Sequence, residues 1–165
     1  MKTILFVCTG NICRSPMAEA LMRDRLARAG LDAEVQVVSA GVWAESGDRA
    51  STGAVVVLRN RGIDMAAHRS KPVTTELLKA ADIILVMEEA HRRSIFYLAP
   101  EVLSKVFLLA EMAGRHDEVD DPFGGTIEGY TVTADEIAAL IDKGLPKILK
   151  RIGVCTASSP GTSAA

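Results

Sequence analysis

Short apolar runs alternate along the chain with segments in which apolar residues recur at helical spacing. The apolar runs cover residues 3–7, 35–40, 82–87 and 105–109, and we interpret each as a strand. Because the runs at 3–7 and 82–87 are almost continuously apolar instead of alternating with polar residues, both faces of the resulting sheet should be covered. The pattern therefore predicts a sheet that is buried inside the domain.

The segments between the strands predict helices, and proline and glycine mark where they begin and end. One helix should begin at Pro16 and end before Gly30, a second should cover 50–61 and end at Gly62, and a short third should begin at Thr74. Strands that alternate with helices predict an α/β domain of three layers, with about four parallel strands and helices on both faces.

The C-terminal third predicts one long helix. Thr133 and Glu136 have the spacing of a capping box and should begin it, and Pro146 should kink or break it. We expect a single domain over residues 1–153. Residues 154–165 are mostly small or polar, so we expect a flexible tail.

Composition and charge indicate a globular protein and limit the kinds of molecule that it is expected to bind. A chain of 165 residues with 48% hydrophobic and 24% charged residues fits one globular domain. The net charge of -2 provides no broad basic surface, so we expect neither nucleic acid nor a membrane as partner. No apolar run reaches the roughly 18 residues that cross a bilayer. The odd count of three cysteines favours a reducing compartment and hence a cytoplasmic location.

The segment that follows the first strand carries the candidate chemistry. Cys8 ends the strand, five residues including Gly10 separate it from Arg14, and a helix then begins. Backbone N–H groups of such a loop, the helix N-terminus and the arginine fork together favour a bound dianion. The same positive field favours the thiolate, which is the nucleophilic form of Cys8. The residues expected to bind phosphate are Thr9, Gly10, Asn11, Ile12, Cys13 and Arg14.

Two other interpretations of this loop fit less well. The Gly-Lys-Ser/Thr sequence of nucleotide-binding loops is missing. Cys8 and Cys13 form no convincing zinc pair, because the third cysteine, Cys155, lies far along the chain. We therefore expect no metal and no cofactor.

Residues 7–16, VCTGNICRSP, closely resemble the signature of the low-molecular-weight protein tyrosine phosphatases, and the resemblance extends over about residues 2–152. It implies a four-stranded parallel sheet and a catalytic aspartate directly before a proline. That aspartate is Asp121, with its neighbour Asp120 as the competing candidate. It would protonate the leaving group and later activate water, whereas Cys8 is the nucleophile.

The resemblance also implies supporting residues around the loop. Asn11 and Ser15 would hold the loop in shape, with Ser39 and His68 as further members of the same network. For His68, an ordinary structural histidine is an equally good interpretation. Cys13 matches a cysteine that can form a disulfide with Cys8 under oxidation, and simple packing behind the loop is the alternative.

For the substrate, the resemblance implies a phosphorylated protein, with inorganic phosphate as product and inhibitor. The expected rim of the pocket is Ile12, Trp43 and Phe123, which suits a phosphotyrosine ring. A bacterial arginine-phosphatase branch is also similar, but it typically has Thr at the position of Ile12. Tyrosine therefore ranks first and phosphoarginine second. An arsenate reductase and an inactive phosphate-binding module rank lower.

Overall fold

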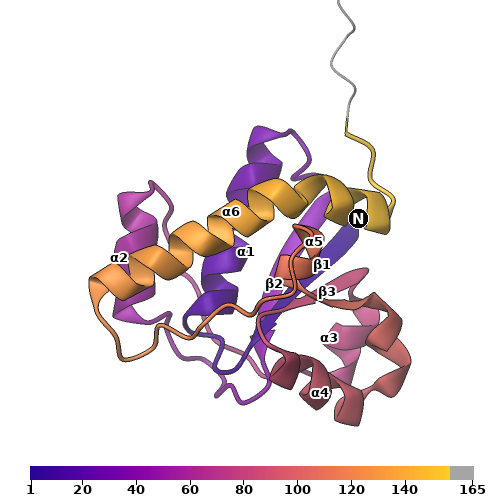
Figure 1. Ribbon diagram of the computed structural model, residues 1–165, viewed down its shortest axis with the longest axis horizontal. Coiled ribbons are helices and arrows are strands. Elements are labelled where there is room, and N and C mark those ends of the chain that lie inside the picture. The colour runs from indigo at the N-terminus through magenta and orange to yellow at the C-terminus, as the bar shows by residue number, and fades with distance from the viewer. Residues whose placement is uncertain (157–165) are drawn as a thin grey trace, which may run out of the picture.

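The computed structural model describes residues 1–156 and contains a parallel four-stranded sheet with the order β2-β1-β3-β4 (Figure 1). The strands are β1 (Lys2–Cys8), β2 (Val35–Gly41), β3 (Ile83–Val86) and β4 (Val106–Leu108). All four predicted strands are thus confirmed, with ends that differ by at most one residue. The central position of β1 places the end of this strand, Cys8, in the middle of one edge of the sheet.

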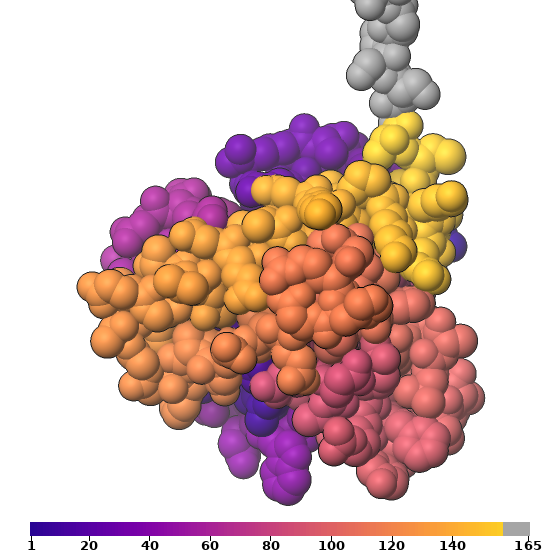
Figure 2. Space-filling view, viewed as in Figure 1, coloured from indigo at the N-terminus to yellow at the C-terminus, as the bar shows by residue number. Residues whose placement is uncertain are grey.

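Helices cover both faces of the sheet, so the predicted three-layer arrangement is also confirmed. Figure 1 shows α1, α2 and α6 together on one side, with α3 and α4 on the other. In the space-filling view, α6 and the segments before it cover most of the N-terminal segment (Figure 2). The helical elements are α1 (Arg14–Arg28), α2 (Thr52–Asn60), α3 (Thr75–Ala80), α4 (Glu89–Leu98), the 3-10 turn η1 (Pro100–Lys105), α5 (Leu109–Met112) and α6 (Ile127–Ile152).

Two hydrophobic cores explain why the central part of β1 is apolar on both faces. Ile4 and Phe6 of β1 belong to the core under α1 and α6, whereas Leu5 and Val7 belong to the core under α3 and α4. All four side chains are completely buried. Successive strand residues point to opposite faces, so a strand between two helical layers needs apolar residues at every position.

The predicted start of the long C-terminal helix was wrong. α6 begins at Ile127, six residues before Thr133. The Thr126 hydroxyl accepts the N–H of Gly129 at 3.1 Å and caps the helix, whereas the Thr133 hydroxyl donates to the Gly129 carbonyl, as helix-interior threonines do. The spacing of Thr133 and Glu136 therefore fell inside a helix that was already formed.

The end of α6 and the segment after it differ in part from the prediction. Of the kink or break predicted at Pro146, the break does not occur, because α6 continues through this residue to Ile152. Val154 still packs on the core beyond the end of α6. Most of the predicted flexible tail lies outside the described residues. None of the helices within residues 1–156 combines the length and apolar character needed to cross a membrane.

Close packing of Gly53 in α2 against Tyr130 in α6 leads to a prediction about stability. A Cβ at position 53 would lie 2.5 Å from two atoms of the Tyr130 ring, whereas a Cβ at Gly129 would meet its nearest neighbour at 3.5 Å. We expect Gly53→Ala to lower the free energy of unfolding by about 1–3 kcal/mol through overpacking. Gly129→Ala, the matched control near the start of α6, should be neutral or stabilising. Urea denaturation tests both, and equal stability of the two variants would contradict the packing argument.

Candidate active site

The segment between β1 and α1 forms a loop at the carboxyl edge of the sheet. Cys8 is the last residue of β1, and α1 begins at Arg14 with Cys13 as its N-cap. The β2 strand approaches the loop so closely that a Cβ at Gly41 would lie 2.4 Å from the Thr9 carbonyl oxygen, so glycine is required there. The loop is thus fixed between a central strand and the positive end of a 15-residue helix.

A cavity of about 180 Å³ opens above this loop, and it brings together residues that are far apart in the sequence. Asp121 and Phe123 line it opposite the loop, whereas the competing candidate Asp120 does not. The Trp43 side chain is 83% exposed and also lies outside the lining, although its backbone N–H donates to the Thr9 carbonyl. The lining consists of Cys8, Thr9, Gly10, Ile12, Cys13, Arg14, Asp121 and Phe123.

The Arg14 guanidinium is held at the cavity by partners from two later segments and from the loop itself. Its Nη1 donates to the Val119 carbonyl at 2.8 Å and lies 3.3 Å from a Glu88 carboxylate oxygen. Its Nη2 lies 3.7 Å from Asp121 and donates to the Thr9 hydroxyl at 3.4 Å. Only 2% of Arg14 is exposed, so these contacts fix the direction of the fork in a place that water barely reaches.

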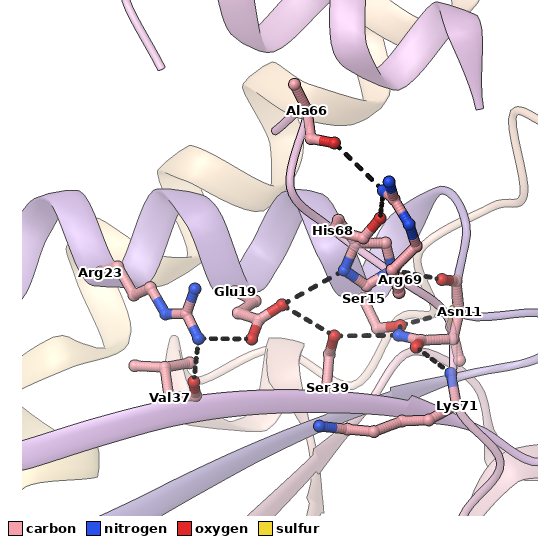
Figure 3. Close-up of polar contacts among 11 residues, drawn as sticks. Asn11, Ser15, Glu19, Arg23, Val37, Ser39, Ala66, His68, Arg69 and Lys71 are labelled. Atoms are coloured by element: carbon pink, nitrogen blue, oxygen red, sulfur yellow. Dashed lines mark hydrogen bonds and ion pairs between the residues drawn. The ribbon is translucent and has the colours of Figure 1, made fainter. Parts of the chain in front are cut away.

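A chain of hydrogen bonds that begins at Asn11 supports the loop between β1 and α1 (Figure 3). Asn11 adopts a left-handed backbone conformation, with φ of 55°, and is fully buried. The Asn11 amide donates to both the Ser15 and Ser39 hydroxyls at 2.9 Å, and its oxygen accepts the N–H of Lys71. The Ser15 oxygen lies 2.8 Å from the Cys8 sulfur. Since Ser15 accepts from Asn11, its own proton is free to stabilise a Cys8 thiolate.

The chain continues to a buried carboxylate that the sequence analysis did not single out. Glu19 accepts from Ser39 at 3.0 Å, lies 3.7 Å from His68 Nδ1 and pairs with Arg23 at 2.8 Å. Burial raises the pKa of Glu19, but the contacts with His68, Arg23 and Ser39 outweigh it, so the net effect is a lowered pKa. His68 in turn contacts the Asn11 carbonyl at 2.8 Å. All four predicted supporting residues therefore lie in one network.

Cys13, the last residue of the loop, lies in a different environment from Cys8. Its sulfur contacts the Ser51 hydroxyl at 3.2 Å and the Tyr130 hydroxyl at 3.3 Å. Burial is the largest cause that raises the pKa of Cys13, and burial also raises the pKa of Tyr130 to about 12. Cys8 and Cys13 are both buried free thiols that line the same cavity. The burial of Cys13 thus favours its protonated thiol over the thiolate.

Glu88 and His91 are the other site residues that sequence reasoning missed. They follow β3, and the predicted helices did not include α4, which contains His91. A signal was available, because carboxyl ends of neighbouring parallel strands meet at one edge of a sheet. Within the described part of the chain, no three His, Cys, Asp or Glu side chains gather in a group that could hold a metal ion.

Comparison with known proteins places this geometry in a family. Residues 3–154 match the family described as "Low molecular weight phosphotyrosine protein phosphatase". The chain belongs to this phosphatase family. The match covers nearly the whole length, so the resemblance seen around residues 7–16 extends to the complete fold and is confirmed.

Relatives within the phosphatase family have two different names. A protein-arginine-phosphatase of Bacillus subtilis (strain 168) is 44% identical over 90% of this chain and 97% of its own length. A probable low molecular weight protein-tyrosine-phosphatase, EpsP of Ralstonia solanacearum, is 40% identical over 92% and 97%. A solved structure of a YwlE arginine phosphatase mutant with a phosphorylated active site serine is 44% identical, covers 90% of this chain and 95% of that one, and superposes with a TM-score of 0.84.

Proposed function

We propose that the protein hydrolyses phosphotyrosine in protein substrates through a phosphocysteine intermediate. The observation that carries this proposal is the cavity in which Cys8, Arg14 and Asp121 meet. A nucleophile, a phosphate-binding cation and an acid converge there from two distant parts of the chain. An inactive phosphate-binding module would need no acid at this place.

In the first step, the Cys8 sulfur attacks phosphorus, and an S–P bond forms as the bond to the leaving oxygen breaks. The loop N–H groups and Arg14 bind the three remaining phosphoryl oxygens and stabilise their charge in the transition state. Asp121 transfers its proton to the leaving oxygen, so that the substrate departs as a neutral hydroxyl.

In the second step, a water molecule attacks phosphorus and the S–P bond breaks. Asp121, now ionised, takes the proton of this water, and Cys8 leaves as a thiolate that the Ser15 hydroxyl stabilises. Inorganic phosphate is the product, and it should also inhibit because it fits the same loop. A relative with a phosphorylated active site serine supports a covalent route on this fold.

We expect Asp121→Asn to lower kcat by about 10²-fold, because the variant has no proton to give to the leaving oxygen. The loss should be larger with phenyl phosphate than with p-nitrophenyl phosphate, whose more acidic leaving group needs less help. Steady-state kinetics with both substrates measures this difference.

Asp120→Asn is the matched control for this experiment. Asp120 is the chain neighbour of Asp121, and it does not line the cavity. It should retain nearly full activity on both substrates. A large loss in Asp120→Asn together with near-normal activity in Asp121→Asn would assign the acid to the other carboxylate.

The lining of the cavity favours an aromatic substrate. Ile12 and Phe123 contribute apolar side chains to this lining, and apolar side chains of this kind suit a flat aromatic ring. A guanidinium would gain no hydrogen bond from Ile12. Phosphoarginine is the second candidate, and the arginine phosphatase that is 44% identical to this chain is the observation in its favour.

A paired assay separates the two substrates. We expect wild-type protein to release phosphate faster from a phosphotyrosine peptide than from a phosphoarginine peptide of the same sequence. Ile12→Thr should shift the ratio of the two kcat/KM values toward phosphoarginine by about tenfold, the effect of one hydrogen bond. Faster release from phosphoarginine by the wild type would show that phosphoarginine is the preferred substrate. The two proposed chemical steps would not be affected.

Two further expectations rest on the cysteines. We propose that oxidation by a peroxide joins Cys8 and Cys13, with the peroxide reduced as the disulfide forms, and that this protects Cys8 from irreversible oxidation. We also propose a cytoplasmic location, where thiols stay reduced. Mass spectrometry after peroxide treatment tests the first proposal, and cell fractionation tests the second.

A further inference from the structure

His91 is a buried histidine that takes no part in the two proposed reaction steps. It lies in the first turn of α4 and is only 1% exposed. Its Nδ1 accepts the backbone N–H of Glu88 at 3.1 Å. A ring nitrogen that accepts a hydrogen bond carries no proton, so in the neutral ring the proton must be on Nε2.

The surroundings keep this ring neutral near physiological pH. Burial, and after it the positive charge of Arg14, lower the pKa of His91 to about 4, although Asp121 acts in the opposite direction. A Glu88 carboxylate oxygen lies 3.3 Å from Nε2, where it stabilises the N–H at that position. Nε2 of His91 therefore acts as a hydrogen-bond donor.

The partner of this donor is the Thr9 hydroxyl in the phosphate loop. His91 Nε2 lies 2.9 Å from Thr9 Oγ1, and Arg14 Nη2 donates to the same oxygen at 3.4 Å. A hydroxyl oxygen has two lone pairs, so two donors occupy both of them. The Thr9 proton must then be donated to a third group, and Thr9 lines the cavity beside Cys8.

We propose that His91 is a positioning residue, which makes the Thr9 hydroxyl a hydrogen-bond donor to the phosphoryl group in the cavity. The proposal deepens the function proposed above and rests on it. It adds one side-chain donor to the backbone donors of the loop. The adjacent, parallel β1 and β3 bring the two residues together, although 82 positions separate them in the sequence.

Titration calorimetry with inorganic phosphate tests this donor without requiring turnover. Thr9→Val removes the hydroxyl with little change in shape and should weaken phosphate binding about tenfold, whereas Thr9→Ser should stay within about twofold of the wild type. His91→Leu should weaken binding to a similar extent. Because His91 acts through Thr9, the double variant should bind no more weakly than Thr9→Val alone.

Ile95→Ala is the matched control for a damaged α4. Ile95 is a fully buried residue of the same helix and belongs to the core under α3 and α4. This variant should lower the melting temperature and leave phosphate affinity unchanged. If it weakens phosphate binding as much as His91→Leu does, or if the effects of Thr9→Val and His91→Leu multiply, the positioning role is overturned.

Failure of this inference can be distinguished from failure of the proposed function. Normal phosphate affinity in Thr9→Val would overturn the donor and leave the chemistry of Cys8 standing. Turnover by Cys8→Ser would overturn the proposed function, while the phosphate titrations would still report on Thr9 and His91.

Discussion

Cys8→Ser should abolish turnover of p-nitrophenyl phosphate while the fold survives. A serine hydroxyl at this place remains protonated and is a far weaker nucleophile than a thiolate, so we expect kcat to fall on the order of 10³-fold or more. The change removes little volume, and Ser15, the neighbour of the sulfur at 2.8 Å, can also hydrogen-bond to a hydroxyl. The melting temperature should therefore stay within a few degrees of that of the wild type.

Cys155→Ser provides the matched control, because Cys155 is an exposed free thiol beyond α6. It should retain wild-type kinetics. Substantial activity in Cys8→Ser, or a comparable loss in Cys155→Ser, would show that Cys8 is not the nucleophile.

Arg14→Lys should have the second large effect, although it conserves the charge. The planar fork contacts Val119 and Glu88 through one nitrogen and faces Asp121 through the other, whereas an ammonium group is a single point of charge. Lysine can neither hold two phosphoryl oxygens side by side nor keep these partners. We expect kcat/KM to fall roughly 10³-fold, the scale at which arginines contribute to phosphoryl transfer.

Arg28→Lys is the corresponding control on α1, since the Arg28 side chain is 70% exposed and pairs with Asp24 on the helix surface. Steady-state kinetics and thermal melting of both variants separate a loss of chemistry from a loss of fold. Near-normal activity of a folded Arg14→Lys variant would contradict the role of the fork.

The strands and the phosphate loop could be predicted because their signals are local. β3 and residues 4–8 of β1 are apolar at every position, since each strand lies between two helical layers, and a short run of this kind is typical of a buried strand. The nucleophile Cys8 and the cation Arg14 are only six residues apart in the sequence, within one loop. Asp121 could be singled out over Asp120 because the resemblance implies an aspartate directly before a proline, and Asp121 does line the cavity.

Elements and residues that depend on distant contacts could not be predicted in this way. α4 has only His91 and Ile95 buried, and its Phe96 and Tyr97 are exposed, so no apolar stripe marks it as a helix. Glu19 and Glu88 look like ordinary surface carboxylates in the sequence. Only the order of the strands and the packing of α1 bring them to the loop.

If the phosphoryl group passes through Cys8, the phosphocysteine intermediate should be trappable. Asp121→Asn is the useful variant, because p-nitrophenyl phosphate needs little acid in the first step, whereas the second step lacks its base. The reaction is mixed rapidly, stopped in denaturant at alkaline pH and digested for mass spectrometry. We predict one phosphoryl group on the peptide that contains Cys8, bonded to the cysteine sulfur. Steady release of p-nitrophenol with Cys8 unmodified, or with the phosphoryl group on another residue, would contradict it.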